Sequence, residues 1–344
     1  TLRNILLNNV NNLKQTRYLQ LEQDYKNDLI KDKIKLLKKT PFIIVLLIWT
    51  ATATAQDYID LATFDYAMTP VNSFDTTDAT TTLQEINGNL SAPIVINDRF
   101  TFLTGIIYEN ISAAFDPGQN EESLTGLTLK LGTNIKHNSK WSGTYMLLPK
   151  ISSDFKKISN RDFQLGGVVL MKYIKTDRLN YKFGVYANSE LFGPFIVPLF
   201  GFYYLNSNEK FEAKALLPLS VDLNYSVTKN VRFGLNFKGQ TRSYHLNTPA
   251  ETEVDRYLVK FSQDVYTYFQ YGTKNGFICQ LGVGRSLGRS YRIYDEKISL
   301  GLPLLNFGDN RTQLNTDFSD SWLFKVSIFY RLKLKKTKGM NSNK

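Results

Sequence analysis

The sequence predicts an all-β protein, an antiparallel transmembrane up-and-down β-barrel of about 14 strands. From Gln56 onward, apolar and polar residues alternate with the two-residue period of a strand that has two unlike faces. The alternating segments are about 9 to 14 residues long, whereas strands of globular proteins usually have about five or six. The connections between them alternate between long and short, as in barrels that cross a membrane.

The last predicted strand, "WLFKVSIFYRLKL" at 322–334, shows the two faces most clearly. One face is entirely apolar, and the other carries most of the polar residues, Lys325, Ser327, Arg331 and Lys333. The segments at 99–109, 127–135, 179–188, 219–227 and 231–239 repeat the pattern. A face of Leu, Val, Phe and Tyr suits lipid, and a face of Lys, Asn, Gly and Ser suits a polar lumen. A large soluble β-sandwich or barrel also alternates, but its strands are shorter.

The connections provide an independent count of the strands. Strands expected at 57–68, 82–94 and 99–109 are followed, in that order, by a long connection, a short one at 95–98 and a long one at 110–123. The alternation continues only if 210–228 forms two strands that turn at Leu217-Pro218-Leu219, because a proline costs no ladder hydrogen bond in a turn. The count is then 14, or 12 if two strand pairs are misassigned, and both fit the even numbers of bacterial barrels.

A short apolar run precedes the strands. Residues 42–49 are too few for a spanning helix, which needs about 20 apolar residues. Basic residues before the run and Ala53-Thr54-Ala55 after it predict a signal peptide at 35–55. The signal implies export by the Sec route and, with the strand pattern, the outer membrane of a Gram-negative bacterium. We expect 1–34 to be a non-native or misassigned extension, 56–334 the barrel and 335–344 a basic tail.

Charge and cysteine content exclude several classes of protein. The formal net charge is +11, but residues 1–55 carry +5 and residues 333–344 carry another +5, which leaves +1 for the body between them. Charge placed in this way makes no binding groove, so we expect no nucleic-acid partner. The single cysteine, Cys279, allows no internal disulfide. The expected partners are outer-membrane lipid, the outer-membrane assembly machinery and a small solute.

No catalytic or metal-binding motif stands out. His137 lies in a predicted turn, and His245 lies near the outer rim, where an enzyme would need a serine or a carboxylate within hydrogen-bond reach of it. The stretch "GVGRSLGRS" at 282–290 lacks the G-x-G-x-x-G spacing and the strand-to-helix context of a dinucleotide site. We therefore expect no catalytic residue, no metal and no cofactor.

Charged residues on the polar face of the strands are the candidates for function. As lumen-facing residues we predict Lys130, Lys172, Lys182, Asp222, Arg232, Lys238, Lys260, Lys325 and Arg331. They predict either a cationic pore that favours anions or a ladder of paired charges that fills a closed barrel. The first implies a channel or transporter for small solutes, and the second implies a structural or surface-binding barrel. An outer-membrane lipid-modifying enzyme is a minor alternative.

The chain resembles a family of Bacteroidetes-type outer-membrane β-barrels of unknown function. The residues that carry the resemblance are the signal, the block "FIVPLFGFYYLNSNEKFEAKALLPLSVDLNYSVTKNVRFGLNF" at 195–237 and the amphipathic final strand. The resemblance covers essentially all of 56–334 and implies fold and location but no activity. Barrels of this kind usually end on an aromatic residue, whereas this chain continues for 14 residues beyond Tyr330. We expect an internal assembly signal that ends at Phe329-Tyr330.

Overall fold

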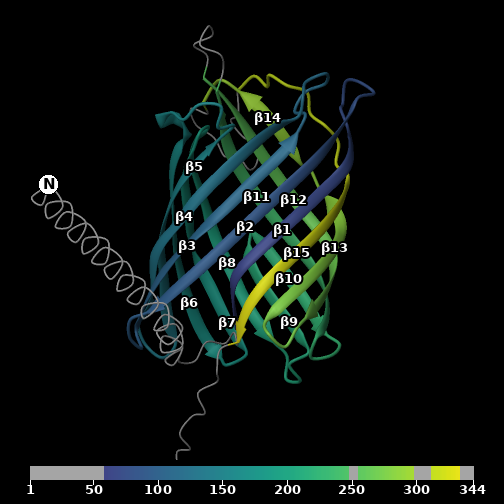
Figure 1. The fold of residues 1–344 in the computed structure, drawn as a ribbon. Helices are drawn as coiled ribbons and strands as arrows, with labels where there is room; N and C mark the ends of the chain where they lie inside the picture. Colours follow the sequence, from purple (N-terminus) through teal and green to yellow (C-terminus); the bar gives the residue numbers. More distant parts are fainter. Residues whose placement is uncertain (1–57, 248–254, 298–310, 334–344) are drawn as a thin grey trace, which may run out of the picture. The chain divides into compact units, whose positions relative to one another are not determined.

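The computed structural model describes residues 58–247, 255–297 and 311–333. The predicted signal peptide, the extension before it and the basic tail lie outside the described residues. Fifteen strand segments form the wall of a barrel, and one short 3-10 helix lies in the connection between β5 and β6 (Figure 1). The strands are β1 (Tyr58–Ser73), β2 (Thr80–Val95), β3 (Phe100–Ala113), β4 (Glu122–Lys136), β5 (Trp141–Ser153), β6 (Phe163–Thr176), β7 (Leu179–Glu190), β8 (Gly193–Leu205), β9 (Phe211–Leu217), β10 (Ser220–Ser226), β11 (Val231–Leu246), β12 (Arg256–Gly272), β13 (Phe277–Ser286), β14 (Ser290–Tyr294) and β15 (Trp322–Lys333), and the helix is η1 (Asn160–Asp162).

The wall is a closed antiparallel barrel of 14 strands, as the sequence predicts. Each strand pairs with its neighbour in the chain from β1 to β13, and β15 pairs with both β13 and β1 to close the ring. β13 and β14 are two parts of one wall strand, because both pair with β12 along its length. They are separated at 287–289, where Gly288 has a φ of 60° that favours glycine. The glycine-rich stretch is therefore a strand break.

The two ends of the barrel differ in their connections. One end, which we call the short-turn end, carries the turns at 96–99, 137–140, 177–178, 206–210, 227–230 and 273–276. Tyr58 and Lys333, the first and last residues of the wall, pair with each other at this end (Figure 1, bottom). The opposite end, which we call the long-loop end, carries the connections 74–79, 114–121 and 154–162 and the long segment between β14 and β15.

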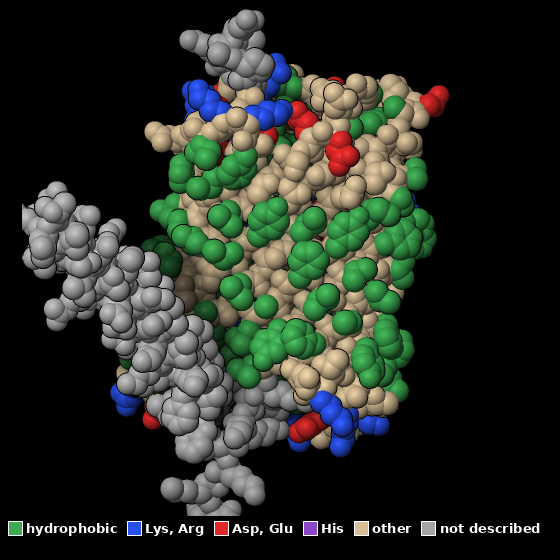
Figure 2. Space-filling model, viewed as in Figure 1, with side chains coloured by type: hydrophobic (Ala, Val, Ile, Leu, Met, Phe, Trp, Pro, Cys, Tyr) green, Lys and Arg blue, Asp and Glu red, His purple; other side chains and the backbone are tan. Residues whose placement is uncertain are grey.

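The outer surface is a belt of exposed apolar side chains. Every second residue of β15 from Trp322 to Tyr330 is exposed, whereas Leu323 and Ser327 between them are buried. Figure 2 shows hydrophobic side chains across the middle of the visible face and charged side chains gathered at its two ends. Such a band between polar rims is the surface that a transmembrane barrel presents to lipid. In the described residues, no helix has the length and apolar character to cross a membrane.

Strand lengths depart from the prediction in two directions. β1 and β3 continue to Ser73 and Ala113, beyond the predicted ends at 68 and 109, because their ladders extend above the apolar belt. β9 and β10, in contrast, have only seven residues each. The predicted turn around Pro218 joins them, so the division of 210–228 into two strands is confirmed.

The interior near the long-loop end is filled by an apolar cluster. Tyr244 of β11, Leu258 of β12 and Tyr291 of β14 pack there against the inner faces of β2, β3 and β4. We call this the upper cluster; its buried members are Phe74, Leu83, Ile111, Ala113, Phe115, Leu124, Tyr244, Leu258, Tyr291 and Phe318. The side chains come from both ends of the chain, so the cluster ties the first strands of the barrel to the last.

Candidate functional site: an internal cavity beside a notch in the wall

The wall has a notch above the β9–β10 hairpin. β9 pairs with β8 only from Phe200 to Leu205, and β10 pairs with β11 only from Arg232 to Lys238. The long-loop halves of β8 (193–199) and β11 (239–246) therefore have no hairpin strand between them. We call this interval the notch; its floor is the hairpin turn at Leu217-Pro218-Leu219.

Above the hairpin, β11 turns into the barrel. Residues from Gln240 to His245 are mostly buried on both faces of the strand, unlike the lower half, where Phe233 and Leu235 are exposed. His245 forms a parallel bridge to Ser153 of β5, so β11 crosses to a strand that is not its neighbour in the ring. β6, β7 and β8 then lie outside it, and Phe195 and Val197 of β8 pack against β12.

A cavity of about 760 Å³ lies where the notch meets the lumen. Its lining includes residues from both faces of β11, Phe237 and Thr241 on one and Asn236 and Lys238 on the other, so the cavity reaches around the strand through the notch. None of the buried members of the upper cluster lines it. The volume is within the range of about 300–1,000 Å³ typical of ligand pockets.

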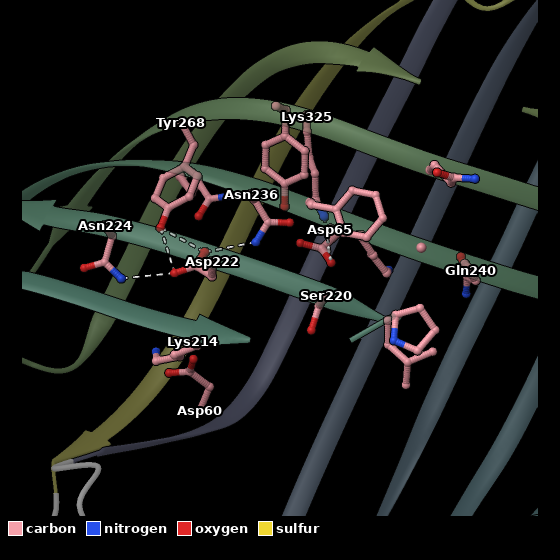
Figure 3. A pocket seen from close by; sticks show the side chains of 18 of the residues that line it. Asp60, Asp65, Lys214, Ser220, Asp222, Asn224, Asn236, Gln240, Tyr268 and Lys325 are labelled. Carbon is pink, nitrogen blue, oxygen red and sulfur yellow. Dashed lines mark hydrogen bonds and ion pairs between the residues drawn. The ribbon is translucent and has the colours of Figure 1, made fainter. Parts of the chain in front are cut away.

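The lumen side of the cavity is polar and charged (Figure 3). Asp222 accepts hydrogen bonds from Asn224, Asn236 and Tyr268, which come from β10, β11 and β12. Lys325 Nζ lies 3.4 Å from the Asp65 carboxylate, and Arg331 donates two hydrogen bonds to Asp60 at 2.6 and 2.9 Å. Most of the acidic groups in the cavity are thus already bonded to the protein.

The structure places all nine predicted residues on the inner side of their strands but brings only some of them together. Asp222, Arg232, Lys238, Lys325 and Arg331 line the cavity. Lys260 is 2% exposed and donates to Glu85 at 2.7 Å, outside the cavity.

The other three predicted lysines lie on the wall formed by β4, β6 and β7. Lys130 donates to Asn89 and Ser91, both at 2.6 Å. Lys172 and Lys182 are directly opposite each other on β6 and β7, and in the described part of the chain neither has an ion-pair partner.

Several acidic partners were missing from the sequence prediction. Asp60 and Asp65 differ in parity, so strict alternation puts them on opposite faces of β1. A bulge between Asp60 and Ala62 shifts the register and turns both carboxylates inward. The opposing Arg331 and Lys325 on the last strand were the only signal in the sequence for these pairs. The buried Glu109 and Glu190 and the partly buried Glu85 were also not predicted.

The two histidines have different surroundings. His245 Nδ1 lies 2.6 Å from Asp162 and Nε2 lies 2.9 Å from Asp255, so carboxylates do lie within reach of it. Ser243 Oγ donates to Glu190 instead of to the histidine. His137 is exposed in a turn, with Nε2 3.2 Å from the Tyr145 hydroxyl.

Comparison with known families identifies the chain over most of its length. Residues 53–331 match the sequence profile of DUF6268, described as a domain of unknown function. The chain belongs to this family. A comparison with curated proteins finds no match. The closer assignment to Bacteroidetes-type barrels stays a prediction for this DUF6268 member.

Solved structures similar to the DUF6268 barrel are outer-membrane barrels. An outer-membrane channel of Pseudomonas putida F1 has 8% identity and a TM-score of 0.42, and the match covers 79% of this chain and 93% of that one. The P. putida toluene transporter TodX has 10% identity and a TM-score of 0.36, with coverage of 81% and 91%. The NanC porin has 9% identity and a TM-score of 0.30, with coverage of 78% and 100%.

Proposed function

We propose that this DUF6268 protein is an outer-membrane channel for small solutes, with a lumen that favours anions. The observation that carries the proposal is the polar cavity of about 760 Å³ inside a closed barrel whose outer surface is an apolar belt. A barrel of 14 strands is wide enough to hold water or a ligand. The location in the outer membrane of a Gram-negative bacterium is part of the same proposal.

The anion preference is supported by the balance of charges that remain after pairing. Lys260, Lys325 and Arg331 are neutralised by carboxylates. Arg232 and Lys238 in the cavity, in contrast, have no ion-pair partner among the described residues, and neither do Lys172 and Lys182 nearer the short-turn end. Rings or rows of like charge of this kind set the selectivity of pores.

Single-channel conductance of the purified barrel in a planar bilayer, under a salt gradient, tests the proposal. We expect a stable conductance with a reversal potential that indicates anion preference. The double variant Lys172→Gln/Lys182→Gln should reduce that preference by removing two positive charges from the lumen. Lys274→Gln, in an exposed turn at the same end, is the matched control and should leave the reversal potential unchanged.

A non-conducting binding barrel is the second candidate function. The upper cluster favours it, because that cluster fills the long-loop half of the interior with apolar side chains. A folded barrel that stays silent in the bilayer would support this alternative over the channel. We propose no enzymatic role, since the Ser243 hydroxyl donates to Glu190 and not to His245.

A further inference from the structure

We propose that the notch is a permanent side opening through which an amphiphile, with an apolar tail and an anionic head group, passes between the membrane and the cavity. The inference deepens the proposed function, since it adds a route and a ligand class to the same lumen. Four features of the described residues carry it. They are the backbone of the β8 edge, the backbone of the β11 edge, the position of the notch within the apolar belt and the distribution of charge in the cavity.

On the β8 edge of the notch, prolines stand at positions where a backbone N–H would have no strand to bond. Leu205 N–H bonds toward β7 and Asn206 N–H bonds toward β9. Alternate residues direct their backbone groups to opposite sides, and the β7–β8 register is continuous, so the even-numbered residues of β8 face β9. Above the hairpin these are Pro194, Ile196 and Pro198, and two of the three have no N–H to leave unpaired.

On the β11 edge of the notch, side chains form hydrogen bonds to backbone groups that have no neighbouring strand. By the same alternation, Thr241, Ser243 and His245 direct their N–H and C=O groups toward the notch, on the side where β10 pairs lower down. Ser243 N–H donates to Glu190, and its carbonyl accepts from Ser152 and Gln164.

The His245 carbonyl, on the same edge, accepts from the Asp154 N–H. Unpaired backbone is costly at membrane depth unless it is bonded within the protein or lines a cavity. Ser243 and the His245 carbonyl meet the first condition, and Thr241 meets the second because it lines the cavity. Pro194 and Pro198 have no N–H that would need a partner.

The notch lies within the lipid-facing belt. On β8, Phe200 is level with the hairpin turn and Ile196 is above it, and both are 64% exposed. On β6, at a higher level than Ile196, Leu165 and Phe163 are exposed as well. Apolar outer surface therefore continues above the floor of the notch, so the opening faces hydrocarbon and admits molecules that partition into it.

The two sides of the cavity differ in chemistry. Phe195, Val197, Leu219, Phe237 and Phe261 line it at the notch. The lumen side carries the hydrogen-bonded carboxylates of Asp60, Asp65 and Asp222.

Lys238 pairs with Ser220 at the hairpin tip, and it lines the cavity. Because Lys238 and Arg232 form no ion pair with a carboxylate of the described residues, an anionic head group suits the lumen side, and an apolar tail suits the notch.

Binding and cross-linking to the purified protein test the inference. The first probe is 11-(dansylamino)undecanoate, displaced by dodecanoate or by dodecyltrimethylammonium. The second is dodecanoate with a photoreactive diazirine at the end of its tail. We expect dodecanoate to displace the fluorescent probe far better than the cationic amphiphile, and Lys238→Gln to weaken binding about tenfold or more. Cross-links of the tail should map to 195–198, 237–241 or 259–263.

Two further variants control for folding and for the route. Ser220→Trp places an indole in the cavity at the hairpin tip, opposite Lys238, and should block both binding and cross-linking. Leu281→Trp places the same indole on the lipid-facing side of β13 and should change neither. Folding of each variant is checked by its heat-modifiable mobility on a gel.

The possible failures are distinguishable. Cross-links confined to the rims or to the outer belt, equal displacement by the cationic amphiphile, or unchanged binding in folded Ser220→Trp would each overturn the side opening or its ligand class. A barrel that binds the probe at the notch but does not conduct would overturn the channel and retain the opening. A barrel that conducts but does not bind the probe would overturn the opening and retain the channel.

Discussion

The wall from β1 to β5 and the wall from β8 to β11 satisfy their backbone hydrogen-bonding groups in different ways. In the first region every strand has 13 to 16 residues and partners on both sides over most of its length, so the ladder itself satisfies most of the backbone. In the second, the hairpin strands have seven residues, and prolines and buried polar side chains replace the missing ladder. The comparison teaches that a barrel can hold an opening in its side if each free edge is satisfied by other means.

The largest expected effect comes from breaking the support of the β11 edge. Glu190 accepts from the Ser243 N–H and hydroxyl and lies 3.5 Å from Lys150 Nζ, all of them buried. Glu190→Ala leaves a buried ammonium and a buried N–H without partners, so we expect a loss of about 3–5 kcal/mol in the free energy of unfolding. Urea unfolding in lipid vesicles measures it.

Glu121→Gln, at an exposed loop position, is the matched control and should stay within about 0.5 kcal/mol of the parent. A Glu190→Ala barrel as stable as the parent would mean that the β11 edge is held by something other than this carboxylate.

A proline scan along β8 separates the open edge from the paired one. Ile196 and Phe200 both point outward and are 64% exposed, but only Phe200 pairs with β9. Phe200→Pro should cost about 2–3 kcal/mol more than Phe200→Ala, because it removes a ladder hydrogen bond. Ile196→Pro should cost no more than about 1 kcal/mol relative to Ile196→Ala. Equal costs at the two positions, measured by the same unfolding assay, would show that the edge above the hairpin is paired.

The smallest expected effect has the opposite sign and concerns the regular wall. Lys172 and Lys182 face each other across β6 and β7. Because like charges directly opposite each other are destabilising, Lys182→Gln should raise the free energy of unfolding by up to about 1 kcal/mol. A loss of stability instead would indicate that Lys182 neutralises a group in the folded barrel. Lys274→Gln, in the exposed turn, should have no effect.

Strand pairing that follows the chain was predictable because it depends on local pattern. Alternation in "WLFKVSIFYRLKL" assigns Leu323 inward and Trp322 outward, and the structure confirms both. Pro218 marked the hairpin turn that makes the strand count even. Alternation failed at β1, where the bulge beyond Asp60 changes which residues face the lumen. A bulge has no period of its own, so nothing in the local pattern reveals it.

The site was less predictable than the wall. Five of the nine predicted residues line the cavity, but their carboxylate partners Asp60 and Asp65 are more than 250 residues away from Arg331 and Lys325 in the chain. Pairing at that distance depends on closure of the ring between β1 and β15. Pro194 and Pro198 were visible in the sequence as residues that an interior strand disfavours, and they were the available signal for the notch.

By itself, the sequence determined which segments become strands, which face of each meets lipid and how many strands close the ring, because side-chain alternation is a property of neighbouring residues. Only the tertiary structure decided that β9 and β10 stop halfway, that β11 turns inward to β5 and that a cavity opens beside them. Those features depend on which strand lies next to which, and on buried bonds such as Ser243 to Glu190 between residues 53 positions apart.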